Sequence, residues 1–144
     1  IWQPDNITSD TTPPDIFSKY HLPFYEKIGT KCREAGKVYL VHIDGKTKAL
    51  HTLIEKAPID VIESFTLPLM GSDMTIEEAL QAWPDKVICP NFPSSLCLES
   101  KDMILGYMKR ISASFGNKPY MIQISEDIDD TKYNHVLRTL GKAM

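Results

Sequence analysis

Residues 37–45 read KVYLVHIDG, a short apolar run that ends in polar residues and a glycine. β-Branched and aromatic residues dominate the run, and Gly36 and Gly45 bound it, as is typical of a strand. Its nearly continuous apolar character indicates a strand buried on both faces, which is the environment of a parallel sheet. The segment therefore predicts a parallel strand over residues 37–43, with His42 and Asp44 at or just beyond its carboxyl end.

Helical and extended patterns alternate along the rest of the chain. Helical spacing predicts a helix over 15–35, with a kink or break at Pro23. Further strands are predicted at 60–65, 86–92 and 120–124, and further helices at 46–56, 75–83, 100–115 and 132–142. Thr75 and Glu78 match a capping box at the start of one of these helices. Residues 1–14, which are polar and rich in Thr and Pro near their end, are expected to form a loop leading into the domain.

This alternation predicts an α/β fold of βαβ units around a parallel sheet. One helix followed by four strand–helix units corresponds to the C-terminal half of a TIM (β/α)8 barrel, so residues 1–144 are expected to be a single partial domain. A doubly wound open sheet fits the same pattern, but no glycine-rich phosphate loop follows a strand. Half a barrel leaves edge strands and an open apolar interior. We therefore expect a missing N-terminal half, or self-association, to cover it.

Composition narrows the classes of partner. The chain of 144 residues has a net charge of −3 and no basic stripe, which argues against nucleic acid as a partner. No apolar run approaches the ~18 residues typical of a membrane span. The three cysteines are widely spaced and not in CxxC form, which predicts free thiols in a reducing, cytoplasmic setting.

Polar residues recur at or near the carboxyl ends of the predicted strands. They are His42, Asp44, Glu63, Asn91, Glu126 and Asp127. The carboxyl ends of barrel strands carry the active site, and residues two apart on a strand face the same side. We therefore expect Glu63 and Asp44 as catalytic residues, and Asn91 and Asp127 as contacts to a small-molecule substrate.

These residue types allow two kinds of chemistry and several structural roles. Imidazole and carboxylate groups suit zinc, manganese or iron(II), and the same groups can perform general acid–base catalysis. Alternatively, His42 bonds a neighbour in the core, Asp44 serves as a turn or helix-capping residue, and the acidic pair at 126–127 is solvated surface. Glu63 is harder to explain structurally, because a buried carboxylate is costly unless it is paired or functional.

The chain also resembles a known family, on segments that occur in the family's order and spacing. They are residues 17–28, 36–45, 60–63, 75–79, 83–87 and 91–93. The chain resembles the second half of members of the uroporphyrinogen decarboxylase family, over nearly its whole length. The resemblance implies a (β/α)8 barrel with its pocket at the strand carboxyl ends. It also implies one of two chemistries: cofactor-free decarboxylation of porphyrinogen acetate groups, or zinc-dependent methyl transfer from a corrinoid protein to a thiol.

The sequence departs from both branches of that family. The decarboxylases end their last strand in His where this chain has Glu126, and the methyltransferases bind zinc through a His-x-Cys pair and a later Cys. Here the pair is His42-x-Asp44, and Glu126 stands near the later Cys position. Our hypothesis is a divalent metal, zinc or similar, held by His42, Asp44 and Glu126, with Glu63 nearby and a corrinoid protein as partner.

Two other functions remain open from the sequence. One is metal-free decarboxylation of a porphyrinogen-like or smaller carboxylate, and the other is a non-catalytic binding remnant of a barrel. An enzyme is favoured for the complete protein, because polar residues recur so regularly at strand ends, whereas the fragment alone is expected to be inactive. Metal content separates the first hypothesis from the second.

Overall fold

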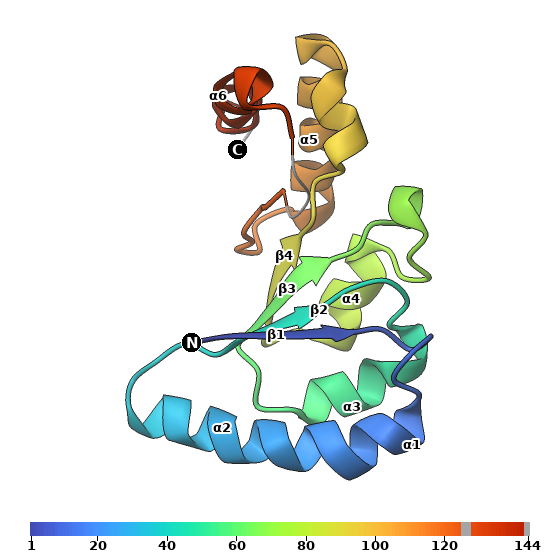
Figure 1. The fold of residues 1–144 in the computed structure, drawn as a ribbon, viewed down its shortest axis with the longest axis vertical. Coiled ribbons are helices and arrows are strands. Elements are labelled where there is room, and N and C mark those ends of the chain that lie inside the picture. The colour runs from blue at the N-terminus through green and yellow to red at the C-terminus, as the bar shows by residue number, and fades with distance from the viewer. Residues whose placement is uncertain (125–127, 143–144) are drawn as a thin grey trace.

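The computed structural model describes residues 1–124 and 128–142. It is an α/β structure built on a four-stranded parallel sheet, in which each strand pairs with the next along the chain. The strands are β1 (Trp2–Ile7), β2 (Leu40–Ile43), β3 (Val61–Phe65) and β4 (Val87–Pro90). The helices are α1 (Pro14–Ile16), α2 (Leu22–Glu34), α3 (His51–Lys56), α4 (Ile76–Ala82), α5 (Lys101–Phe115) and α6 (Asp130–Leu140). From α2 to α5, helices and strands alternate as the sequence predicts (Figure 1).

The first strand is a correction, because residues 1–14 were expected to form a polar loop. Residues 2–7 instead form β1, which pairs Trp2 with Leu40 and Gln3 with Val41. This strand is not evident from the local sequence, because residues 2–7 include proline, aspartate and asparagine, which are uncommon in strands. Proline is tolerated there because β1 is an edge strand in the described structure, with one side free of ladder hydrogen bonds.

The last predicted strand, 120–124, is also different in the structure. The segment forms only two isolated bridges beside β4, Ile88 with Tyr120 and Asn91 with Gln123. It therefore runs parallel to β4 without forming a continuous ladder. The other three predicted strands are present, each shorter than its apolar run.

The long N-terminal helix passes Pro23 without breaking. A π-helical stretch, η1 (Phe17–His21), joins α1 to α2, and the Leu22 amide donates to the Phe17 carbonyl, five residues back. Proline has no amide hydrogen to give to the preceding turn, and the widened turn lies immediately before it. The helical stretch is therefore not broken at Pro23, and the change of helix type lies next to the position where the sequence predicts a kink or break.

Side chains cap the later helices. Thr75 Oγ1 accepts from the Glu78 amide at 3.2 Å, and the Thr75 amide donates to Glu78 Oε2 at 2.9 Å, which confirms the capping box. Ser100 accepts from the Met103 amide in the first turn of α5. Such caps replace hydrogen bonds that the first turn of a helix lacks.

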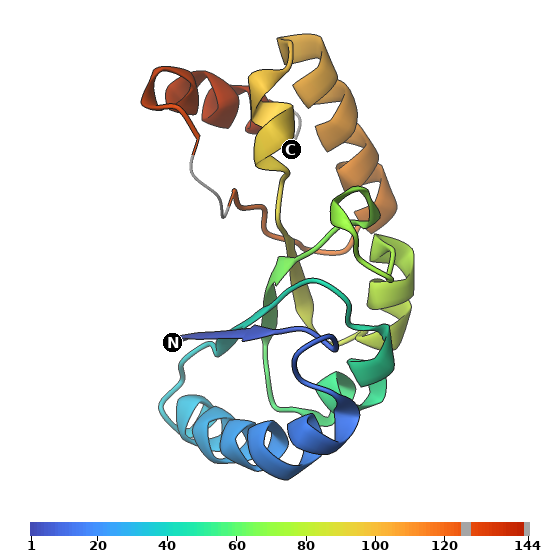
Figure 2. The same cartoon turned by 45° about the vertical axis from the view of Figure 1, so that its right-hand side comes forward.

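The core lies between one face of the sheet and the helices packed on it. Val41 and Ile43 of β2, Ile62 of β3 and Ile88 of β4 are fully buried. Helices α1, α2 and α3 lie at the β1 end of the sheet, whereas α5 and α6 lie beyond the β4 end (Figure 2). None of the helices in the described part of the chain has the length and apolar run needed to cross a bilayer.

Candidate functional site

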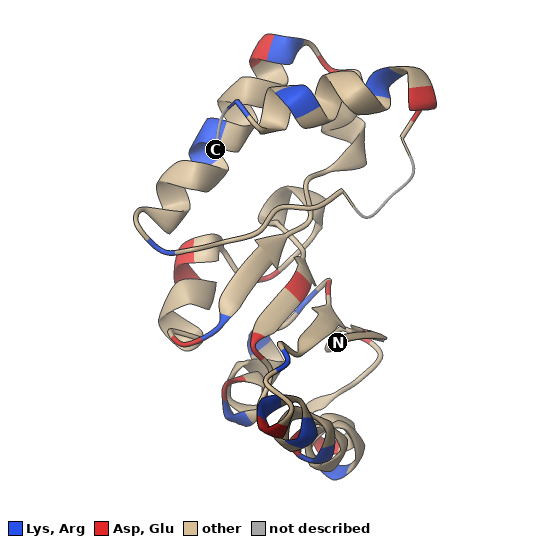
Figure 3. Cartoon of the chain, turned by 90° about the vertical axis from the view of Figure 1, so that its left-hand side faces the viewer, with Lys and Arg blue, Asp and Glu red and all other residues tan. Residues whose placement is uncertain are grey.

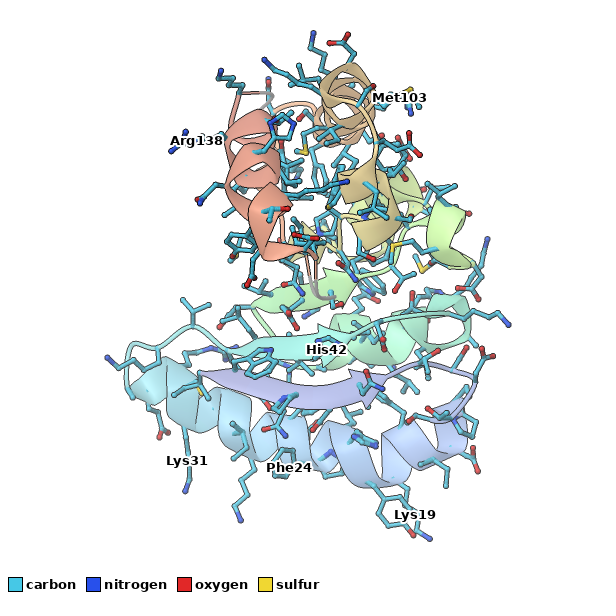
Figure 4. The ribbon with its side chains drawn as sticks, turned by 45° about the horizontal axis from the view of Figure 1, so that its top comes forward. Lys19, Phe24, Lys31, His42, Met103 and Arg138 are labelled. Carbon is cyan, nitrogen blue, oxygen red and sulfur yellow. The ribbon has the colours of Figure 1, made fainter. Side chains whose placement is uncertain are left out.

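Three polar side chains form a row across the middle of the sheet. His42 of β2 is the register partner of Glu63 on β3, and Glu63 is the partner of Cys89 on β4. Register partners in a parallel sheet point to the same face, opposite to the residues on either side of them. The row therefore lies on the face away from the buried Ile62 and Ile88, and Figure 4 shows His42 on the strand between β1 and β3.

Glu63 holds the ring of His42 in place. His42 Nδ1 lies 2.6 Å from Glu63 Oε2, and the Trp2 indole Nε1 donates to the same oxygen at 3.1 Å. Glu63 is only 8% exposed. One oxygen of this buried carboxylate therefore accepts hydrogen bonds from both the His42 and the Trp2 rings. Contacts of this length to a carboxylate are strong. Since Nδ1 is engaged, Nε2 is the ring nitrogen of His42 left to act on a ligand.

Asp44 lies beside that free nitrogen. Its Oδ2 is 3.9 Å from His42 Nε2, and its Oδ1 is buried with no hydrogen-bond partner among the described residues. Burial raises the pKa of the Asp44 carboxyl, although the neighbouring His42 opposes this shift. An oxygen buried without a partner is destabilising, and a ligand or proton bound there would remove that cost.

Neighbouring strands fix the turn that carries Asp44. The Asp44 amide donates to the Ile7 carbonyl at 2.9 Å, and the Gly45 amide donates to Thr66 Oγ1 at 2.7 Å. Gly45 has φ +62°, and a side chain there would meet Thr8 Oγ1 at 2.7 Å. Glycine is therefore required by both conformation and space. The turn is positioned by β1 and by the segment after β3.

A strained residue follows Glu63. Ser64 is 1% exposed and has φ +65°, and the register between β3 and β4 shifts between Glu63 and Phe65. A non-glycine residue in this region costs on the order of 1–3 kcal/mol, and such strain and bulges concentrate at functional sites. Sequence reasoning missed this feature, because serine within an apolar run gives no local signal of a bulge.

The structure brings together some of the predicted site residues. His42, Asp44 and Glu63 form one cluster, in which Glu63 contacts His42 directly. Asn91 is buried directly after β4, where its backbone amide donates to the Phe65 carbonyl at 3.0 Å. Glu126 and Asp127 lie outside the described residues, so their predicted roles in metal and substrate binding stay predictions.

Two further residues belong to the cluster although they were not predicted as part of it. Trp2 was missed because it was assigned to a loop, and its place on an edge strand was the missing information. Cys89 is one of the three cysteines predicted to be free thiols, and burial, together with the charge of Glu63, raises the pKa of its thiol to about 11. That thiol donates to Gln123 Oε1 at 3.4 Å. Because only a thiolate is a strong nucleophile, these features indicate an unreactive thiol.

The donor set fits the predicted metal in part. Among the described residues, no three His, Cys, Asp or Glu side chains are grouped so as to hold a metal ion. His42 Nε2 and Asp44 could provide two ligands, and the predicted third, Glu126, is not described. A histidine whose other ring nitrogen bonds a carboxylate is the usual arrangement of metal-ligating histidines. The described cluster therefore supplies two donors and one residue that orients them.

Comparison with known proteins gives no family for the chain. No protein-family model matches the sequence, and a search of curated proteins finds no match. The resemblance to the uroporphyrinogen decarboxylase family therefore stays a prediction based on the segments quoted above.

Proposed function

We propose that the chain is the C-terminal half of a (β/α)8 barrel enzyme resembling the uroporphyrinogen decarboxylase family. The support is the strand order β1-β2-β3-β4, in which parallel strands follow one another without a reversal, with helices between them. A barrel is built by continuing this order until it closes, whereas a doubly wound sheet reverses direction at its binding crevice. In such a barrel the row of His42, Glu63 and Cys89 would face the interior.

We further propose that His42 and Asp44 bind a divalent metal in a methyl-transfer or related reaction. One observation carries this proposal: Glu63 engages His42 Nδ1, which leaves Nε2 beside Asp44, whose buried Oδ1 has no partner among the described residues. A metal ion bound there would act as a Lewis acid on a thiol, alkoxide or water. The proposed methyl acceptor is a thiol, and the proposed donor is a corrinoid carried by a partner protein.

Within this proposal the protein residues have distinct roles. Glu63, expected at first to be catalytic, is a positioning residue, because it acts through the His42 ring. Trp2 in turn holds the Glu63 oxygen from the edge strand. Asp44 supplies a negative charge, and burial makes the ionised carboxylate unfavourable. A cation bound beside Asp44, or a proton on it, is therefore favoured.

Metal analysis tests the proposal directly. The protein, purified without chelators, should contain zinc or a similar metal in stoichiometric amount, and His42→Ala and Asp44→Asn should lose it. Glu63→Gln should weaken metal affinity by about 10–100-fold, the usual effect of losing an outer partner of a ligating histidine. His51→Gln is the control, because His51 is an exposed residue of α3. A wild-type protein that neither contains metal nor binds it on titration would refute the proposal.

A second function is favoured by the raised pKa of Asp44. In metal-free decarboxylation the bond from substrate carbon to the carboxylate breaks, CO₂ leaves, and the electron pair stays on the carbon. Asp44, whose pKa burial raises, would donate the proton that this carbon takes up. Carbon dioxide release by a metal-free protein, lost in Asp44→Asn, would favour this reaction. The non-catalytic alternative is weaker, because Glu63 is buried rather than turned into solvent.

A further inference from the structure

A polar cavity lies between the start of α5 and one side of α6, in a part of the chain that the proposed reaction does not use. Its volume is about 380 Å³, and its lining includes Lys101, Thr131, His135, Arg138 and Lys142. The volume is near the lower end of the range for small-molecule sites, roughly 300–1,000 Å³. The residues that line it are all polar or charged, which favours a ligand recognised through charge and hydrogen bonds.

Asn134 and Thr139 line the cavity, and four further lining residues follow helical spacing along α6 and the turn after it. Thr131, His135, Arg138 and Lys142 are separated by four, three and four residues, the spacing that places side chains above one another on a helix. Val136 and Leu140 lie on the buried side. The positive groups therefore gather along one side of α6 and the turn after it, and they meet Lys101 from the first turn of α5.

The cations of this cavity are not neutralised within the described structure. Lys101, Arg138 and Lys142 have no carboxylate within ion-pair distance among residues 1–124 and 128–142. Lys46 and Lys48, by contrast, pair with Asp10 and Glu78. Figure 3 shows Lys and Arg residues spaced along α6, and Figure 4 shows Arg138 on its surface. Three permanent positive charges around one cavity in a chain of net charge −3 attract an anion.

We propose that this cavity binds a phosphate group of a small molecule. Arginine presents a planar fork that matches phosphate oxygens, and lysines add point charges to it. The Asn134 amide and the His135 ring add hydrogen-bond donors to the lining. Asp129, a carboxylate next to the stripe, already accepts from the Thr131 amide and hydroxyl at the start of α6.

The test is a titration of the ¹⁵N-labelled protein with inorganic phosphate at constant ionic strength. Amides of α6 and of the start of α5 should shift and saturate together. Arg138→Gln should weaken the binding about tenfold, as expected for the loss of a charge-assisted bidentate contact. Lys132→Gln is the matched control, because it removes the same charge from the same helix outside the cavity lining; its dissociation constant should stay within about twofold.

Three outcomes would overturn the assignment. Shifts that fail to saturate would mean diffuse attraction rather than a site, and so would equal weakening in Arg138→Gln and Lys132→Gln. Citrate that saturates the same amides at lower concentration than phosphate would assign the cavity to carboxylates instead. Phosphate binding that persists in Asp44→Asn would keep this site separate from the proposed metal centre, so the two proposals can fail independently.

Discussion

In protein freed of metal by a chelator, replacing Asp44 by asparagine should raise the stability at neutral pH, and the same substitution removes the proposed metal site. In the folded chain the Asp44 carboxyl is partly buried, and its Oδ1 has no hydrogen-bond partner among the described residues. Asparagine keeps the shape but carries no charge to desolvate. The expected gain comes from removing the desolvated charge, because asparagine keeps a polar atom at the buried position. We expect Asp44→Asn to raise the free energy of unfolding at pH 7 by about 1 kcal/mol, the low end of the desolvation penalty of an unpaired buried group.

The stability gained by Asp44→Asn should increase as the pH rises from acidic to neutral. Burial raises the pKa of folded Asp44 above its ordinary value of 3.8, so the folded state keeps this proton to a higher pH than the unfolded state does. The wild-type protein therefore loses stability as pH rises from 3.8 through the raised pKa. The Asp44→Asn protein has no carboxyl at this position to lose a proton, so the variant and the wild type should differ little near pH 3 and most at neutral pH.

Urea unfolding at a series of pH values, followed by circular dichroism, measures this difference. Asp10→Asn is the control, because it removes the same charge at an exposed ion pair with Lys46, where we expect a change below about 0.5 kcal/mol. Two results would refute the reasoning. One is an Asp44→Asn protein that is less stable at pH 7, and the other is a stability gain that stays constant across the pH range.

Two further pairs of substitutions test the packing and capping, again by urea unfolding. Gly29→Ala should cost about 2 kcal/mol by overpacking, because its Cβ would lie 2.4 Å from the Pro58 carbonyl oxygen. Gly106→Ala, with nothing within 4 Å, should instead stabilise α5 by about 0.5–1 kcal/mol, and equal effects at both glycines would contradict the packing. Thr75→Ala should cost about 1 kcal/mol through loss of the helix cap, whereas Thr30→Ala, inside α2, should cost clearly less.

The parts of the fold that could be predicted are those with strong local patterns. The runs that became β2, β3 and β4 are apolar and bounded by turn residues, and the capping box marks the start of α4. Strand β1 has no such local pattern. It is stabilised by pairing with β2, more than thirty residues away in the sequence, and a local pattern does not reveal such pairing. The segment 120–124 has the apolar pattern of a strand but does not form one. It makes only two isolated bridges beside β4.

The candidate site could be predicted in outline but not in its contacts. Alternation along a strand predicts that His42 and Asp44 share a face, and the cost of burying a carboxylate singles out Glu63. Pairing of Glu63 with His42 depends on the register of β2 and β3, which no local pattern encodes. The contribution of Trp2 depends on a strand that was not predicted, and the conformation of Ser64 depends on the bulge between β3 and β4.

In the chain of residues 1–144 by itself, where β1 is an edge of the described sheet, the site should be the first part of the sheet to be lost. Strand β1 supplies Trp2, which bonds Glu63, and leads to Thr8, which packs on Gly45 and accepts from the Lys46 amide. In the described structure β1 pairs on one side only, and edge segments open at a lower free energy than the centre of a structure. Fraying of β1 would thus release both the Glu63 oxygen and the Asp44 turn while β2, β3 and β4 stay paired. Heating or mild denaturant should therefore abolish ligand binding before the protein as a whole unfolds.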